Sequence, residues 1–146
     1  MKLLCLIRKV EVVATPEERV RQALLHTMIQ KWGYPASLIS VEKSLTELSS
    51  HPFLPRRRVD IVAYYNEGET LEPLLLIECK AERFQEPAWR QLLGYNHTIQ
   101  APFFAIGAKE SLYCFSSDGT PVEGEPYFQV LLGSVTNTSP STTSTG

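Results

Sequence analysis

Apolar and polar residues along this chain follow patterns that predict a β-sheet. Residues 38–43 alternate between apolar and polar side chains, which is typical of a strand with one exposed face. The four consecutive apolar residues at 74–77 indicate a strand buried on both faces, and hence a central place in the sheet. The expected strands are 38–43, 57–65, 74–80, 102–107 and 111–115. A turn at residues 66–69 is expected to join two of them as a hairpin.

Two further stretches carry helix signals. Residues 15–18 read Thr-Pro-Glu-Glu, an order in which the threonine caps a helix and the proline suits its first turn. Apolar residues then recur at steps of three and four, and Gly33 is expected to stop this helix. A second helix is expected over residues 86–99.

The remaining segments lack a clear period. Residues 1–14 are expected to form an N-terminal arm or a first strand, and residues 44–55 a loop. Residues 134–146 are rich in Ser and Thr, and we expect a disordered tail there. The order of helices and strands predicts one α/β (α+β) domain over residues 1–133. Its core is expected to be a central mixed sheet of about four to six strands flanked by helices.

Composition narrows the class of protein. A chain of 146 residues is long enough for one domain with a hydrophobic core. Its formal net charge of −2 argues against a broad basic surface for nucleic acid, so any such contact must be local. The three cysteines form no C-x-x-C pair, which favours a reducing, cytoplasmic setting. The apolar run at residues 3–7 is too short for a signal peptide or a membrane span, so no membrane contact is expected.

Charged residues border the apolar parts of two neighbouring strand patterns. Glu78 and Lys80 follow the apolar run and point to the same face, because residues two apart on a strand share a side. Charges at the end of a buried strand are costly unless they meet a partner, a metal or a substrate. Asp60 opens the preceding strand pattern. An acid on one strand and Glu-x-Lys on the next is the layout of a metal-dependent phosphodiester hydrolase.

This layout suits a divalent cation. Mg²⁺ prefers oxygen ligands, and Asp60 and Glu78 can hold it while leaving positions open for water and substrate. The backbone carbonyl of Cys79 can add a further oxygen. Lys80 can orient the attacking water, help to deprotonate it, or neutralise charge on the phosphate.

The second predicted helix adds two polar side chains. Gln91 and Tyr95 are four residues apart and therefore share one face of the helix, which a short connection brings back across the site. Gln91 can bond the Lys80 ammonium, the water or a phosphate oxygen, and Tyr95 can contact a phosphate or brace Gln91. Basic residues that can contact a nucleic-acid backbone are Arg56, Arg57, Arg58, Arg83 and Arg90.

Asp60, Glu78-x-Lys80 and Gln91-x-x-x-Tyr95, in this order, resemble the signature of the PD-(D/E)xK nuclease superfamily. The chain resembles in particular the N-terminal nuclease domain of type I restriction enzyme R subunits and its small stand-alone relatives. The similarity extends over about residues 15–107, through blocks at 15–22, 33–35, 58–62 and 76–81.

The resemblance implies a restriction-endonuclease-like core, dependence on Mg²⁺ with Mn²⁺ as an alternative, and DNA as the substrate of a nuclease, more readily an endonuclease than an exonuclease. In many members an acid on the first helix reaches the metal, and by alignment that acid is Glu18. A homodimer or a larger restriction or repair assembly would provide the second site that double-strand cutting needs. The chain lacks the G-x-x-x-x-G-K-[ST] phosphate loop of a DNA-translocating motor, so ATP dependence is not implied.

Each acid also has a structural interpretation. Glu18 can complete a capping box with Thr15, with or without a role at a metal. Asp60 can form a surface salt bridge with Arg57 or Arg58.

The same holds for the other site residues and for the protein as a whole. Glu78 and Lys80 can form an ion pair at a sheet edge, and Gln91 and Tyr95 can be ordinary helix residues. The basic run at 56–58 can be a solvated loop end. The alternative to a nuclease is a non-catalytic nucleic-acid-binding or assembly module on the same fold, and a third hypothesis is a toxin-like or RNA-directed nuclease.

Overall fold

The computed structural model describes residues 1–49, 57–81, 86–108 and 111–136. Within these ranges the elements follow in the order β1 (Lys2–Leu4), β2 (Glu11–Val13), α1 (Pro16–Gln30), the 3-10 helix η1 (Ala36–Leu38), β3 (Ile39–Ser44), α2 (Leu45–Leu48), β4 (Arg58–Glu67), β5 (Thr70–Cys79), α3 (Glu86–Ile99), β6 (Phe103–Ala108), β7 (Ser111–Ser116) and α4 (Phe128–Thr136).

A five-stranded sheet in the order β3-β4-β5-β6-β7 forms the centre of the fold. Strands β5 and β6 run parallel, and the other three neighbouring pairs are antiparallel, so the sheet is mixed. β5 is the middle strand, as its apolar run predicted. The expected α+β class and the expected number of strands are therefore confirmed.

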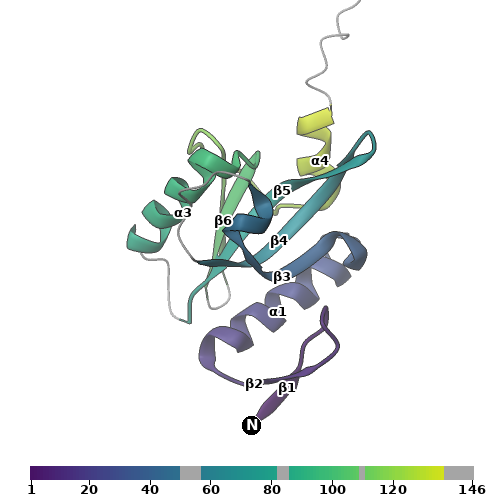
Figure 1. Cartoon of the computed structure of the whole chain (residues 1–146), viewed down its shortest axis with the longest axis vertical. Helices are drawn as coiled ribbons and strands as arrows, with labels where there is room; N and C mark the ends of the chain where they lie inside the picture. Colours follow the sequence, from purple (N-terminus) through teal and green to yellow (C-terminus); the bar gives the residue numbers. More distant parts are fainter. Residues whose placement is uncertain (50–56, 82–85, 109–110, 137–146) are drawn as a thin grey trace, which may run out of the picture.

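Helices cover both faces of this sheet (Figure 1). Leu25 of α1 packs in one core cluster with Ile77 of β5. Leu92 of α3 packs in a second cluster with Leu76 of β5. Alternate residues of β5 thus serve two separate cores, which explains why the strand is apolar on both sides. By the same alternation Glu78 points to the face that α3 covers.

Helix α1 begins and ends where the sequence predicted. Thr15 Oγ1 accepts the N–H of Glu18 at 3.1 Å, and Pro16 is the first helical residue. Gln30 is the last, and Gly33 turns the chain away with a φ of +76°. The helix is held at both ends, so the side chains on its buried face have defined positions.

The β4–β5 hairpin is longer than expected. Its turn contains Gly68 at a φ of +64°, a conformation that glycine adopts without strain. β5 begins at Thr70, ahead of the apolar run, although Pro73 lies within the strand. A register shift between Ala63 and Tyr64 accommodates this proline, which cannot donate a ladder hydrogen bond.

The two ends of the chain differ from the sequence expectations. Residues 1–14 contain a two-stranded antiparallel sheet, β1–β2, where an arm or a single strand was expected. Near the C-terminus, α4 was not predicted; it buries Phe128 and Leu131 against the face that α1 covers. The expected tail begins at 134, but residues 134–136 belong to α4, and 137–146 lie outside the described residues.

The expected loop at 44–55 begins instead with the short helix α2. Glu47 accepts the N–H of Ser44 at 3.2 Å and closes a capping box there. Residues 50–55 lie outside the described part of the chain. Among the described helices, none combines the length and the apolar character needed to cross a membrane.

Candidate functional site

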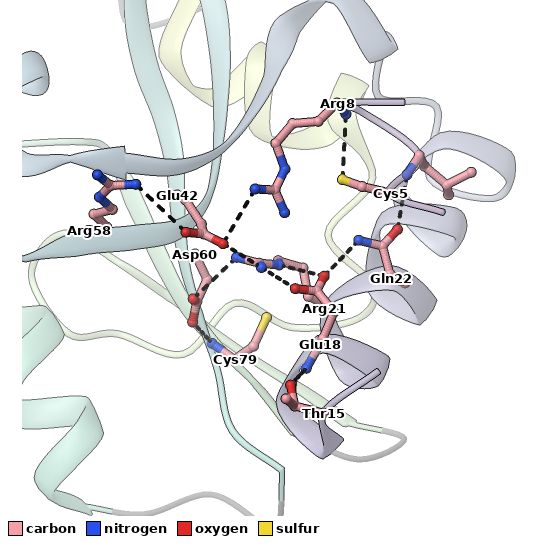
Figure 2. Close-up of polar contacts among 11 residues, drawn as sticks. Cys5, Arg8, Thr15, Glu18, Arg21, Gln22, Glu42, Arg58, Asp60 and Cys79 are labelled. Atoms are coloured by element: carbon pink, nitrogen blue, oxygen red, sulfur yellow. Dashed lines mark hydrogen bonds and ion pairs between the residues drawn. The ribbon is translucent and has the colours of Figure 1, made fainter. Parts of the chain in front are cut away.

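The structure brings Asp60 and Glu78 together where the pairing of β4 and β5 stops. The two strands pair as far as Ile61 and Ile77, and the two acids lie just beyond. Asp60 Oδ2 accepts the backbone N–H of Cys79 at 2.6 Å, so the Asp60 side chain takes over from the backbone ladder (Figure 2). The strand ends are thereby held together by one of the predicted site residues itself.

Burial and mutual repulsion make the charged forms of Asp60 and Glu78 unfavourable. Glu78 is only 5% exposed, and its Oε1 is buried without a hydrogen-bond partner. Burial, together with the charge of Asp60, raises the pKa of Glu78 to about 7. Burial also raises the pKa of Asp60, although the Cys79 amide and Arg21 oppose this shift. Two desolvated acids that repel each other form a site whose energy a cation would lower.

Lys80 lies beside this pair. Its backbone N–H donates to the Gly107 carbonyl at 2.7 Å, which continues the contact of β5 with β6. Its charge lowers the pKa of both Glu78 and Asp60 against the larger effect of burial. β5 is a central strand, and within the described residues no ion pair joins Glu78 to Lys80. The interpretation of the two as an ion pair at a sheet edge is therefore wrong.

The helix α3 places Tyr95 against the same acids. Tyr95 is buried, and its hydroxyl has no hydrogen-bond partner. Burial is the main cause that raises the pKa of Tyr95 to about 12, and the charges of Glu78 and Asp60 add to it. The half-buried Gln91 lies close enough to lower that pKa slightly, without reaching hydrogen-bond geometry. The four-residue spacing thus places Gln91 next to Tyr95, and Tyr95 next to the acids.

The predicted basic residues are divided between different places. Arg57 is exposed, and its guanidinium carbon lies 5.8 Å from the centre of the Tyr95 ring. Arg58 contacts Glu42 at 3.8 Å, and the ion-pair partner of Asp60 is Arg21, so the alternative interpretation of Asp60 as a salt-bridge partner of Arg57 or Arg58 is wrong. Arg90 lines a surface hollow together with Leu93 and His97, and Tyr95 is not part of its lining. Two of the predicted residues, Arg56 and Arg83, lie outside the described residues.

Glu18 is buried and fully engaged within α1. Its carboxylate accepts hydrogen bonds from Arg21, at 3.0 Å from Nε and from Nη2, and from Gln22 at 2.8 Å. The Thr15 N–H donates to Val13 instead, so Thr15 caps the helix but Glu18 does not complete a capping box. Glu18 reaches the acid pair only through Arg21, which contacts Asp60 at 3.6 Å.

Sequence reasoning missed three charged residues around Asp60. Arg21 is 6% exposed and contacts Glu18, Glu42 and Asp60 (Figure 2). Glu17, one position before Glu18, adds to the raised pKa of Asp60, which burial chiefly causes. The three-residue step from Glu18 to Arg21 indicates a pair on one helix face. The sequence gives no sign that the pair is buried or that Glu42 joins it.

The donor set fits a two-acid metal site. Asp60 and Glu78 supply carboxylate oxygens, and Glu78 Oε1 still lacks a partner. Over the described ranges, no group of three or more His, Cys, Asp or Glu side chains is placed to hold one ion. A magnesium ion commonly keeps several waters and takes one or two carboxylates, so two acids are enough.

Comparison with known proteins assigns the chain to a family. A family model described as type I restriction enzyme R protein N terminus matches residues 16–130, which include the five-stranded sheet, α1 and α3. No curated protein and no solved structure matches the chain. Because the matched range covers most of the chain and contains every residue of the acid pair's surroundings, this protein belongs to the type I restriction enzyme R protein N-terminus family.

Proposed function

We propose that this protein is a Mg²⁺-dependent deoxyribonuclease, more readily an endonuclease than an exonuclease, which hydrolyses phosphodiester bonds with a metal-activated water. Membership of a restriction-enzyme family supports nuclease chemistry on DNA. Glu78 carries the proposal: it is buried, it interacts with the charge of Asp60, and it keeps one oxygen without a partner. Buried polar atoms normally find a hydrogen bond, so an unpaired carboxylate oxygen beside a second acid supports a role in binding a cation.

The metal would be held by Asp60 and Glu78, with the backbone carbonyl of Cys79 as a further oxygen ligand and Mn²⁺ as an alternative ion. Bound Mg²⁺ supplies charge stabilisation at the phosphate and lowers the pKa of a water. Glu18, whose carboxylate is engaged by Arg21, is a possible ligand only if that bond opens, and otherwise acts from outside the metal's shell.

The other residues of the site act on the water and the phosphate. Lys80 orients the attacking water and neutralises charge that develops on the phosphate. Gln91 holds the same water or a phosphate oxygen. The Tyr95 hydroxyl, buried without a partner, donates to a phosphate oxygen or braces Gln91.

Contact with DNA is proposed to be local, since the chain carries a net charge of −2. Arg57 and Arg58 are exposed beside the acid pair and can contact backbone phosphates. Arg56, Arg83 and Arg90 remain predictions of the same kind. A cytoplasmic setting, and a homodimer or a larger restriction or repair assembly for double-strand cutting, belong to this proposal.

A non-catalytic nucleic-acid-binding or assembly module is the second candidate. The observation that favours it is that Glu18 and Asp60 already have partners within the protein. Arg21 contacts both acids, and the Cys79 N–H donates a hydrogen bond to one Asp60 oxygen. In such a module the acids would have a structural role, which is to make these contacts, and no metal would be needed.

Cleavage of duplex DNA, single-stranded DNA and RNA in Mg²⁺ or Mn²⁺ separates these candidates. Asp60→Ala, Glu78→Ala and Lys80→Ala are each expected to abolish cleavage with the fold retained, as judged by circular dichroism. The matched control is Glu72→Ala, an exposed acid on β5, which is expected to cut like the unmodified protein. Equal cleavage by the unmodified protein and Glu78→Ala would refute the proposal. Salt-dependent binding without cleavage would support the module, and cleavage of RNA alone would support an RNA-directed enzyme.

A further inference from the structure

Arg21 joins three acids that come from three different elements. It forms ion pairs with Glu18 of its own helix, with Glu42 of β3 and with Asp60 of β4. Its side chain is 7% exposed and that of Glu18 is 8% exposed, whereas Glu42 is 35% and Asp60 30% exposed. An arginine has a rigid fork of donors that can serve several carboxylates at once, which a lysine cannot do.

The three contacts differ in closeness. Arg21 Nε donates to Glu18 at 3.0 Å, and Nη2 donates to Glu42 at 2.8 Å and also to Glu18. Nη1 lies 3.6 Å from Asp60 Oδ1, beyond hydrogen-bond distance. Glu18 and Glu42 therefore fix the guanidinium, while Asp60 feels its charge and keeps a lone pair of Oδ1 for another cation.

Glu42 reaches Arg21 from a strained backbone position. In β3 it lies between Val41, which pairs with Ile61, and Lys43, which pairs with Val59. Its register position is opposite Asp60, but it leaves the ladder with a φ of +52°. Such a conformation is costly for a residue other than glycine, asparagine or aspartate, and it persists only where surrounding contacts enforce it.

Further contacts hold Glu42 and Glu18 from outside. Arg8 lies 3.5 Å and Arg58 3.8 Å from the Glu42 carboxylate. Gln22 donates to Glu18 at 2.8 Å and accepts the Leu6 N–H at 3.0 Å, so the chain after β1 is linked to the same cluster (Figure 2). On its opposite side Asp60 accepts the Cys79 N–H.

We propose that Arg21, held by Glu18 and by the strained Glu42, is a positioning residue that fixes the orientation of the Asp60 carboxylate for a divalent cation. Arg21 touches neither the cation nor the DNA. Glu18 acts through Arg21 rather than as a ligand. The inference rests on the proposed function for its meaning, but the orientation of Asp60 can be measured without metal or substrate.

The hydrogen bond from Cys79 to Asp60 provides that measurement. The Cys79 amide proton is followed by NMR in EDTA, and Asp60→Ala gives its position when the bond is absent. In Arg21→Lys, which keeps the charge but loses the fork, this proton is expected to move upfield towards the Asp60→Ala position. Glu42→Gln is expected to cause a smaller shift in the same direction. Arg19→Lys, on the exposed side of α1, is the control and is expected to leave the proton in place.

A Mg²⁺ titration of the same samples tests the functional part. Arg21→Lys is expected to weaken Mg²⁺ binding by about 10-fold, the low end of what loss of an outer-shell partner costs. The double variant Arg21→Lys/Glu42→Gln is expected to bind no more weakly than Arg21→Lys alone, because the two residues act as one unit.

Unchanged Cys79 proton positions in both single variants would overturn the inference, as would fully additive losses of Mg²⁺ affinity. If Arg21→Lys does not fold, Glu42→Gln alone decides, because Glu42 is partly exposed and its loss is milder. If the unmodified protein fails to bind Mg²⁺ while the proton shifts occur, the proposed function fails and the positioning role of Arg21 stands.

Discussion

Asp60 and Glu78 come from neighbouring strands, yet their surroundings differ in how well polar atoms are satisfied. Around Asp60, Arg21 and the Cys79 amide supply positive charge and a short hydrogen bond. Around Glu78, two buried oxygens, Glu78 Oε1 and the Tyr95 hydroxyl, have no partner. Asp60 thus has partners within the protein, whereas Glu78 keeps an oxygen that can still accept a hydrogen bond or bind a cation.

The surroundings of the two acids are expected to have opposite effects on the free energy of unfolding. Removing a partner around Asp60 should destabilise the fold, because several acids would lose the buried guanidinium that neutralises them. The arrangement around Glu78 should destabilise the fold, because desolvated acids and unbonded hydroxyls cost free energy until a ligand arrives. Variants on the two sides are therefore expected to change the free energy of unfolding in opposite directions.

The largest expected effect is on the Asp60 side. Arg21→Met leaves Glu18, Glu42 and Asp60 without their shared cation, and removal of one partner from a buried ion pair costs about 3 kcal/mol or more. Urea denaturation followed by circular dichroism measures this loss. The control Arg19→Met changes an exposed residue of the same helix and is expected to remain within about 0.5 kcal/mol of the unmodified protein. A loss in Arg21→Met as small as in the control would remove the stabilising role of the cluster.

A gain of stability is expected on the Glu78 side. The pKa of Glu78 rises to about 7 in the folded protein from an ordinary value of 4.5, so its charged form costs stability above pH 7. As the pH falls through 7 the folded protein takes up the proton, and the cost disappears below about pH 4.5. Glu78→Gln should therefore stabilise the metal-free protein by about 1–3 kcal/mol at pH 8 and progressively less towards pH 5.

Urea denaturation in EDTA at both pH values gives the result. Glu72→Gln, an exposed acid of the same strand, controls for the loss of one charge. A destabilised Glu78→Gln at pH 8 would mean that Glu78 already has a partner in the folded protein.

The smallest effect is expected from a pair of tyrosines. The Tyr34 hydroxyl donates to the Pro126 carbonyl at 2.7 Å, whereas the equally buried Tyr95 hydroxyl has no partner. Tyr34→Phe should cost about 1 kcal/mol, and Tyr95→Phe should cost nothing or add up to about 1 kcal/mol. Thermal denaturation of both variants compares them directly. Equal losses would show that Tyr95 is bonded in the folded protein.

Local sequence signals predicted much of this fold. Thr15 and Gly33 marked the ends of α1 because capping and left-handed turns depend on the residue itself. The apolar run of β5 predicted a central strand, because only a strand covered on both sides loses its alternation. Pro73 obscured the start of that strand, since a register shift, not the local sequence, permits it.

The candidate site was predictable only in part. Glu78, Lys80 and Tyr95 follow from spacing on a strand and a helix, and the structure brings them together. Glu42 could not be predicted, because its φ of +52° and its position opposite Asp60 result from strand register and from contacts with α1. A single chain also gives no indication that Arg21 is buried.

Calorimetric titration with Mg²⁺ shows whether Asp60 and Glu78 hold a divalent cation. The unmodified protein is expected to bind Mg²⁺, Glu78→Ala is expected to lose this binding, and Glu72→Ala is expected to retain it. The reason is that Glu78 holds the one buried carboxylate oxygen of the acid pair that lacks a partner. Equal Mg²⁺ binding by Glu78→Ala and the unmodified protein, or no binding by either, would mean that this acid pair is not a magnesium site.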